Sequence, residues 1–319
     1  MQSIDDGAFV DINGVPQWLT LRGADRGNPA LLLIGGPGFG YAALAPFFAD
    51  WERAFTLVQW DQPGAGFTFA RSGGEATTIE RLVADGIAVA EVACARLGVR
   101  KLALLCFSAG TLVGLEMVKR RPELFAAYVG NGQVVDWARQ DALSYELLLH
   151  RARALEDATM LHELTAIGRP PYADTATDAV KSKYAGAPTP REAAAFADLG
   201  VVVGAALQGA PAGAPYLAAG LHWPEPRARS FAAYAALRAE IVNFDARRLG
   251  CEFAVPMFFL QGADDVFTVS SEVQAYADEL VAPHVAYVRI AEAGHAALLL
   301  RHELRALLER HVRTMLPGA

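Results

Sequence analysis

LALLCFSAGTLVGLEM, residues 102–117, joins an apolar run to a helical pattern through a corner of small residues around Ser108. The apolar run is typical of a buried strand, and the pattern after Gly110 is typical of a helix that packs on it. A strand that turns directly into a helix indicates an α/β protein. The corner leaves two interpretations of Ser108: a nucleophile, or a serine that only caps the helix.

The remainder of the chain repeats this alternation of apolar runs and helical patterns. An amphipathic helix is expected over 77–98, with Thr77 or Thr78 as its cap, and a hairpin is expected at the turn Asn13–Gly14. The other expected strands lie in five segments, most of which are given together with the corner that ends the strand: ALLLIGGPG (30–38), FTLVQWDQPG (55–64), FAAYVGNGQVV (125–135), FAVPMFFLQGADD (253–265) and HVAYVRIAEAGH (284–295). Strands that alternate with helices predict a mostly parallel central sheet with helices on both faces.

The segment 136–250 has a different character, because its charged helical patterns contain no convincing strand. The strand and helix alternation resumes after it. We therefore expect one α/β domain, formed by residues 1–135 and 251–319, with a helical cap inserted at 136–250.

Composition and charge limit the classes of partner. The chain has 319 residues, a formal net charge of −7 and a pI near 5.5, so nothing predicts nucleic-acid binding. The apolar segment Leu199–Trp223 is interrupted by prolines and glycines, which favours a pocket lining over a membrane span. The first residues lack the pattern of a secretory signal, and the three cysteines show no metal or disulfide pattern. We expect a cytoplasmic protein that acts on a small molecule or short peptide, without metal or cofactor.

Two further corners carry the partners that a nucleophilic serine needs. A serine hydroxyl requires a base to accept its proton and a carboxylate to orient that base. Asp264 and Asp265 follow one expected strand, and His295 follows the last. The carboxyl ends of parallel strands meet at one edge of the sheet, so these side chains are expected to converge on Ser108. Asp265 is preferred to Asp264, because its spacing from Gly262 places it past the turn.

The expected oxyanion donors are two backbone N–H groups. Ala109 supplies one at the N-terminus of the helix that follows Ser108. The glycine-rich loop IGGPGFG, residues 34–40, can supply the other, and Gly36 is the chosen donor. Cys106 is the less favoured nucleophile, because a side chain on the strand before the corner would be buried.

These motifs together resemble those of α/β-hydrolases of the proline iminopeptidase type. That family carries H-G-G-P-G, D-Q-R-G-x-G, G-x-S-x-G, G-x-x-D and a Gly-His pair. The corresponding segments here are 34–38, 61–66, 106–110, 262–265 and 294–295. The resemblance implies an α/β-hydrolase fold with a helical cap, and a serine hydrolase that removes N-terminal proline or a small apolar residue.

The sequence departs from that family at Ile34, Pro63 and Cys106, which replace a histidine, an arginine and a glycine. The family's E-N-H-Y-F segment, whose glutamate binds the substrate ammonium, is absent. No acidic residue occurs from Leu199 to Pro224, which leaves Glu225, Glu240 or a residue elsewhere in the cap as candidates for that role. A carboxylesterase or lactonase with an apolar acyl pocket, and a non-catalytic binding protein of the same fold, therefore remain alternatives.

Overall fold

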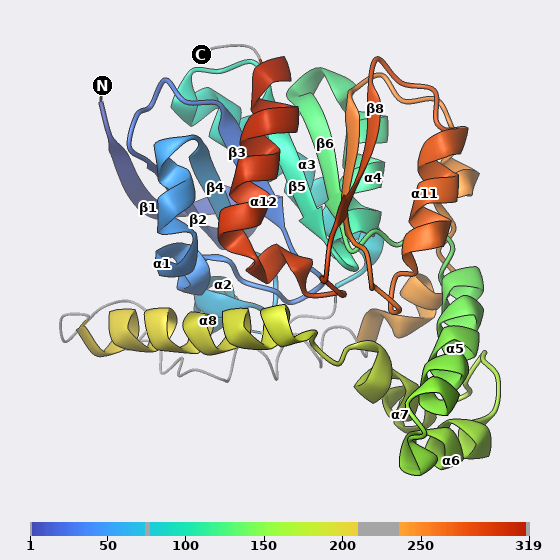
Figure 1. Ribbon diagram of the computed structural model, residues 1–319. Helices are drawn as coiled ribbons and strands as arrows, with labels where there is room; N and C mark the ends of the chain where they lie inside the picture. Colours follow the sequence, from blue (N-terminus) through green and yellow to red (C-terminus); the bar gives the residue numbers. More distant parts are fainter. Residues whose placement is uncertain (1, 74–76, 210–235, 317–319) are drawn as a thin grey trace.

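The computed structural model describes residues 2–73, 77–209 and 236–316, with the side chains of 207–209 excepted. These residues form one sheet of eight strands in the order β1-β2-β4-β3-β5-β6-β7-β8 (Figure 1). The strands are β1 (Ile4–Ile12), β2 (Val15–Gly23), β3 (Ala30–Ile34), β4 (Thr56–Asp61), β5 (Leu102–Phe107), β6 (Phe125–Asn131), β7 (Met257–Gly262) and β8 (Val285–Ile290). The expected mostly parallel sheet is confirmed, because only β2 runs against its neighbours β1 and β4.

The antiparallel edge of the sheet begins with the predicted hairpin. Asn13 and Gly14 have φ angles of 51° and 84°, which are the two positive values that a tight hairpin turn of this kind requires. Asn and Gly tolerate this conformation better than other residues. The hairpin joins β1 to β2, and β2 then pairs with β4.

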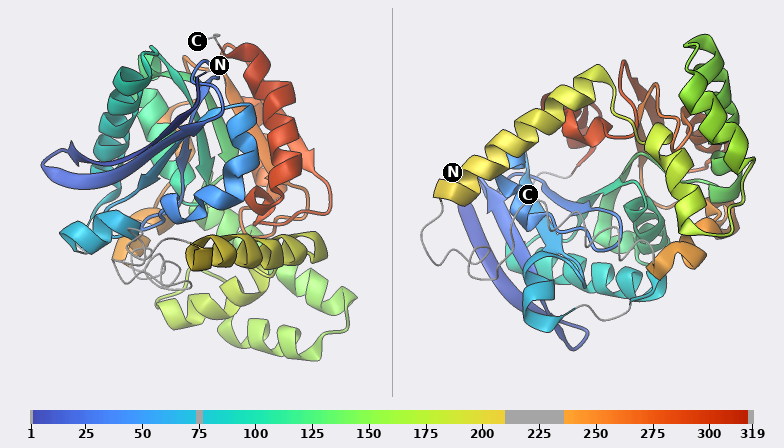
Figure 2. Two further views of the ribbon diagram at one scale, coloured as in Figure 1. Left: turned by 90° about the vertical axis from the view of Figure 1, so that its left-hand side faces the viewer. Right: turned by 90° about the horizontal axis from the view of Figure 1, so that it is seen from below.

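Helices cover both faces of the sheet, as expected, and the left view of Figure 2 shows them on opposite sides of the strands. On one face, apolar residues of α3, α4 and α11 pack in one core cluster. On the other, those of α1 and α12 pack in a second. The α-helices are α1 (Ala45–Phe48), α2 (Gly66–Ser72), α3 (Ile79–Leu97), α4 (Gly110–Arg120), α5 (Trp137–Ala154), α6 (Ala158–Ile167), α7 (Thr175–Ala185), α8 (Pro190–Gly209), α11 (Ser270–Glu279) and α12 (Arg301–Leu307). Thr78 caps α3 and Gly98 ends it, which confirms both predicted boundaries.

The described part of the segment between β6 and β7 contains helices, turns and loops but no strand. It takes part in two isolated bridges: one pairs Glu252 with Val281 shortly before β7, and the other closes the base of the segment. That bridge joins Asp136 to Asp245, where the segment leaves and rejoins the sheet domain. Two backbone bonds strengthen it: Trp137 N–H donates to Phe244 (3.1 Å) and Ala246 N–H donates to Val135 (2.7 Å). The helices α5, α6 and α7 form a projecting lobe, and α8 crosses below the sheet in the view of Figure 1.

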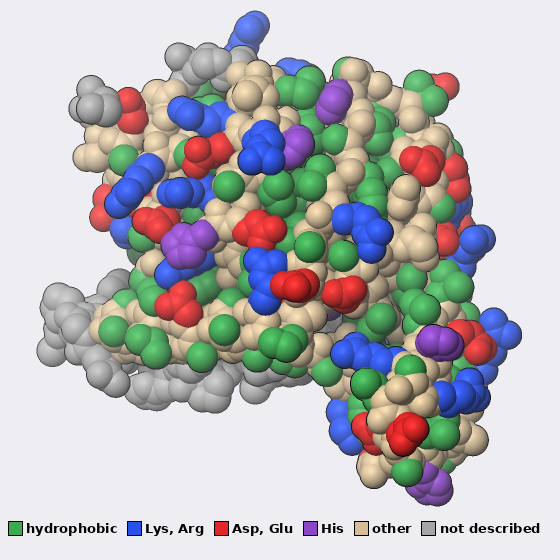
Figure 3. Space-filling view, in the orientation of Figure 1, with side chains coloured by type: hydrophobic (Ala, Val, Ile, Leu, Met, Phe, Trp, Pro, Cys, Tyr) green, Lys and Arg blue, Asp and Glu red, His purple; other side chains and the backbone are tan. Residues whose placement is uncertain are grey.

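The apolar segment that begins at Leu199 is only partly described. Within α8, Leu199 and Val203 are buried against the second core cluster, whereas Val201 is 70% exposed. Figure 3 shows hydrophobic side chains along the outward face of this helix. In the described ranges, no helix is both long and apolar enough to cross a membrane. The predicted pocket lining over 210–223 lies outside the described residues.

Candidate active site

Ser108 lies at the sharp turn between β5 and α4. Its φ angle is 53°, in the left-handed region that non-glycine residues rarely adopt. The Ser108 N–H donates to Asn131 O at 3.0 Å, which ties the turn to the end of β6. Such backbone strain persists only where its surroundings hold it, and it occurs most often at functional sites. A serine that only capped α4 would not need this conformation.

Glycines let the turn pack closely on its neighbours. A β-carbon on Gly110 would lie 2.4 Å from the Gly35 carbonyl oxygen, so no other residue fits there without a shift. The first turn of α4 is therefore pressed against the loop that follows β3. Gln62 also donates to the Gly35 carbonyl, at 3.1 Å, which fixes the loop from the β4 side.

Cys106 replaces the glycine of the usual serine motif, and α4 compensates for its larger side chain. A β-carbon on Gly114 would lie 2.1 Å from Cys106 Sγ, so the absence of a side chain at 114 makes room for the thiol. Cys106 is fully buried, and this burial raises the pKa of its thiol well above the ordinary value. A thiol that stays protonated is a poor nucleophile, in agreement with the preference for Ser108.

The side chains of Ser108, His295 and Asp265 form one hydrogen-bonded line. Ser108 Oγ lies 2.8 Å from His295 Nε2, and His295 Nδ1 lies 3.1 Å from Asp265 Oδ2. An ionised carboxylate can only accept, so Nδ1 carries the ring proton and Nε2 is left to accept from the serine hydroxyl. The structure thus brings together the three side chains that the sequence predicted at separate corners. Asp264 instead lines a neighbouring groove.

The carboxylate of Asp265 is buried within a set of donors. The N–H groups of Phe267 and Thr268 donate to Oδ1 at 2.8 and 2.9 Å, and Thr268 Oγ1 and Gln261 Nε2 donate to Oδ2 at 2.7 and 2.8 Å. Burial alone would raise the pKa of Asp265, but the charge of His295 and these hydrogen bonds lower it below its ordinary value. Asp265 therefore remains ionised at neutral pH. Sequence reasoning did not identify Gln261 or Thr268, because neither belongs to a motif.

Two aromatic rings fix the plane of the imidazole. The Phe267 ring stacks on His295 with the centroids 4.7 Å apart, and Phe107 lies on it at 5.4 Å. Together with the bond to Asp265, these contacts limit rotation of the ring. No other histidine in the described ranges forms a hydrogen bond with Ser108. Those ranges also contain no group of three or more His, Cys, Asp and Glu side chains suited to a metal ion.

The two expected oxyanion donors are neighbours in space. A β-carbon on Gly36 would lie 3.7 Å from that of Ala109, which is the N-cap residue of α4. Among the hydrogen bonds between residues that the structure describes, none uses the N–H of Gly36 or Ala109. The loop that carries Gly36 is bridged to Asp61 through Gly40. The carboxylate of Asp61 accepts from Ala42 N–H, just after the loop, at 3.1 Å and from Phe67 N–H, in α2, at 3.0 Å.

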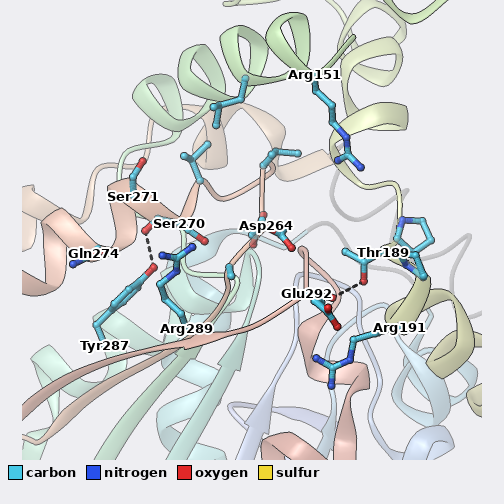
Figure 4. A pocket seen from close by; sticks show the side chains of 17 residues that line it. Arg151, Thr189, Arg191, Asp264, Ser270, Ser271, Gln274, Tyr287, Arg289 and Glu292 are labelled. Atoms are coloured by element: carbon cyan, nitrogen blue, oxygen red, sulfur yellow. Dashed lines mark hydrogen bonds between the residues drawn. The ribbon is translucent and has the colours of Figure 1, made fainter. Parts of the chain in front are cut away.

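A groove of about 860 Å³ lies beside Asp264, between α5, the start of α8 and α11 (Figure 4). Its lining includes Asp265 but neither Ser108 nor His295. The buried carboxylate of Asp265 points to His295 and its oxygens are occupied by the donors above, so it offers nothing to the groove. The groove is therefore not part of the hydrogen-bonded line of Ser108, His295 and Asp265.

Comparisons with known proteins identify the family and the fold of the chain. Residues 29–301 match the family described as alpha/beta hydrolase fold. The chain is 32% identical over 169 residues to a Bacillus subtilis (strain 168) protein named probable aminopeptidase YbaC. That match covers 51% of this chain and 52% of the relative, so it spans about half the length of each.

Solved structures of the same fold include both peptidase-related and esterase proteins. A proline iminopeptidase-related protein of Thermus thermophilus superposes with a TM-score of 0.63 at 20% identity, covering 99% of this chain and 100% of that one. An esterase from Rhodococcus sp. ECU1013 superposes with a TM-score of 0.57 at 15% identity, covering 97% and 99%. At these identities the likeness establishes the fold alone.

Proposed function

Because the chain belongs to the alpha/beta hydrolase fold family, we propose that it is a serine hydrolase that works through an acyl-enzyme on Ser108. Ser108 Oγ attacks the substrate carbonyl carbon while His295 Nε2 takes the hydroxyl proton. The N–H groups of Gly36 and Ala109 stabilise the oxyanion. His295 then gives the proton to the leaving group as its bond to carbon breaks. Water, activated by His295, releases the acyl group and restores the serine.

The observation that carries this proposal is the line of hydrogen bonds from Ser108 through His295 to Asp265, at 2.8 and 3.1 Å. Asp265 stays ionised, so it can hold the imidazole in one tautomer and stabilise the imidazolium that forms during attack. A non-catalytic binding protein would have no need for a strained serine at one end of this line.

For the substrate, we propose N-terminal proline or a small apolar residue of a short peptide. The support is the set of family motifs in the sequence and the aminopeptidase name of the Bacillus relative. Such a substrate brings a free ammonium group, which requires a facing carboxylate when it is desolvated. The cap, proposed to comprise 136–250, is where that carboxylate is expected.

The buried carboxylates of the described cap already have partners. Asp141 forms a buried ion pair with Lys181, and Asp178 lies 3.8 Å from Arg238 Nε. Glu192 accepts backbone hydrogen bonds, and Glu240, which is exposed, accepts from the Ile79 N–H at 3.0 Å. Glu225 lies outside the described residues. Because these carboxylates already have partners, they support a second candidate, a carboxylesterase or lactonase with an apolar acyl pocket, which needs no ammonium site.

Two measurements test the proposal. Incubation with a fluorophosphonate probe should label wild-type protein at Ser108, and an unlabelled folded protein would support the non-catalytic alternative instead. Steady-state kinetics should then be compared on a prolyl arylamide and on p-nitrophenyl esters of short acyl chains. Turnover of the arylamide supports the aminopeptidase. Ester turnover with no arylamide turnover rejects it in favour of the esterase.

A further inference from the structure

Helix α8 begins with a capping box, in the segment Thr189-Pro190-Arg191-Glu192. The Thr189 N–H donates to Glu192 Oε2 at 2.9 Å, and the Glu192 N–H donates to Thr189 Oγ1 at 3.3 Å. This reciprocal arrangement satisfies two backbone donors that a helix N-terminus otherwise leaves open. By itself it is an ordinary helix start.

The same residues also contact the loop 291–294, which directly precedes His295. Thr189 Oγ1 donates to the Glu292 carbonyl at 3.0 Å, the bond drawn dashed between these residues in Figure 4. Glu192 Oε1 accepts from the Gly294 N–H at 2.8 Å. Arg191 Nη1 donates to the Ala291 carbonyl at 2.5 Å. Three side chains of the cap therefore hold the backbone of three loop residues beside the imidazole.

The burial of Glu192 indicates more than helix capping. Its relative exposure is 0%, and no Lys, Arg or His in the described ranges forms an ion pair with it. A buried carboxylate without a cation is costly unless its oxygens are hydrogen-bonded. Each oxygen of Glu192 has one such donor, the N–H of Thr189 or that of Gly294. The bond to Gly294 is therefore part of what makes the burial of Glu192 possible.

The loop is shaped to receive this contact. Glu292 has a φ angle of 54°, in the left-handed region, where a non-glycine residue is strained. A β-carbon on Gly294 would lie 3.0 Å from Glu192 Oε2, so glycine is the residue that lets the carboxylate approach. A strained loop of this kind keeps its conformation only if neighbouring groups hold it, and Thr189 and Glu192 are those groups.

We propose that Glu192 is a positioning residue: through the Gly294 N–H, the cap holds the loop that aims His295 at Ser108. The proposal rests on the proposed serine hydrolase function. It makes the reactivity of Ser108 depend on a cap residue that touches neither the serine nor the imidazole in the described contacts. Loss of the contact is expected to slow the attack step and to leave KM largely unchanged.

The experiment measures the second-order rate of fluorophosphonate labelling, which reports Ser108 reactivity without knowledge of the substrate. Glu192→Ala should label about 10²-fold more slowly, the effect of a displacement of about 1 Å in a catalytic group. Glu192→Gln keeps one acceptor oxygen for the two N–H groups of Thr189 and Gly294, so it should label at a rate between those of Glu192→Ala and wild type. Asp157→Ala is the matched control: it removes the N-cap of α6, a helix of the projecting lobe, and should label at the wild-type rate.

A folded Glu192→Ala protein that labels within about two-fold of wild type would overturn the proposal. If that variant does not fold, Gly294→Ala tests the same contact from the other side, because it changes no residue of α8 and places a methyl 3.0 Å from Glu192 Oε2. It should also slow labelling, and a wild-type rate would reject the contact's role. If wild-type protein is itself unlabelled, the hydrolase proposal fails separately. The downfield NMR signal of the His295 Nδ1 proton then decides, as it should shift or vanish in Glu192→Ala and persist in Asp157→Ala.

Discussion

Ser108 Oγ and His295 Nε2 lie 2.8 Å apart, although 187 positions separate the two residues in the chain. Their neighbours hold them from opposite sides. The strained turn after β5 presents the hydroxyl, and Asp265 and Phe267 fix the imidazole. This contact makes the two residues a single functional unit in the proposed mechanism.

Removal of either residue should therefore have the same effect on turnover. Ser108→Ala and His295→Ala are each expected to lower kcat by about 10⁴–10⁶-fold, and the double variant should be no worse than either single one. The residual rate would come from binding and the oxyanion donors. Single-turnover kinetics on whichever substrate class proves active gives the measurement. Effects that multiply in the double variant would show that the two residues act independently.

Gly114→Ala should destabilise the protein through Cys106. The new β-carbon would lie 2.1 Å from Sγ, and overpacking of this kind costs about 1–3 kcal/mol. Cys106→Gly removes the obstructing thiol. The free energy of unfolding, measured in urea for both single variants and the double variant, should therefore show a favourable coupling of about 1 kcal/mol or more. Additive effects would mean that the thiol and the helix do not constrain each other.

Asp265 should give the protein an acid-dependent component of stability. The pKa of Asp265 is lower in the folded protein than its ordinary value of about 3.9. Its ionisation therefore stabilises the folded protein at any pH above about 3.9, and this contribution is lost as the pH falls from there through the pKa of the folded state. Asp265→Asn cannot ionise. The difference in unfolding free energy between wild type and this variant should shrink as the pH falls below about 3.9. A difference that does not shrink as the pH falls below about 3.9 would contradict the lowered pKa.

The buried pair of Lys181 and Asp141 should be sensitive to the loss of one partner. Burial lowers the pKa of Lys181 to about 8, and its ammonium group forms an ion pair with the carboxylate of Asp141. Lys181→Met should cost about 3–5 kcal/mol, because Asp141 is left as an unpaired buried charge. The double variant Lys181→Met, Asp141→Leu should recover most of that loss. Urea unfolding of the three variants measures this, and no recovery in the double variant would contradict it.

The fold and the line of three side chains were predictable, because their signals are local. The small residues around Ser108, the acidic corner at Asp265 and the Gly-His corner at His295 each follow an apolar run that is a strand in the structure. The order of strands in an α/β sheet then brings their carboxyl ends to one edge. Geometry also separates the adjacent acids, since Asp265 reaches His295 and Asp264 faces the groove.

What escaped prediction depends on contacts between distant positions. The Thr-x-x-Glu pattern at 189–192 is readable as a helix start, but nothing local indicates that Glu192 meets Gly294, 102 positions away. The compensation of Cys106 by Gly114 and the donation from Gln261 to Asp265 are likewise matters of packing. No motif in the sequence indicates which carboxylate would face the ammonium group of the proposed peptide substrate.

The bridge between Asp136 and Asp245 has a consequence for how this architecture can change over time. Since the cap starts and finishes at hydrogen-bonded neighbours, a lid of another length or shape can be grafted there without displacing β6 or β7. Under the proposed function, Ser108, His295 and Asp265 would stay in the sheet domain while the proposed cap is exchanged. A transplanted cap would nevertheless need its own contact with the loop 291–294, which precedes His295. A chimera without that contact is expected to bind ligands but to turn them over slowly.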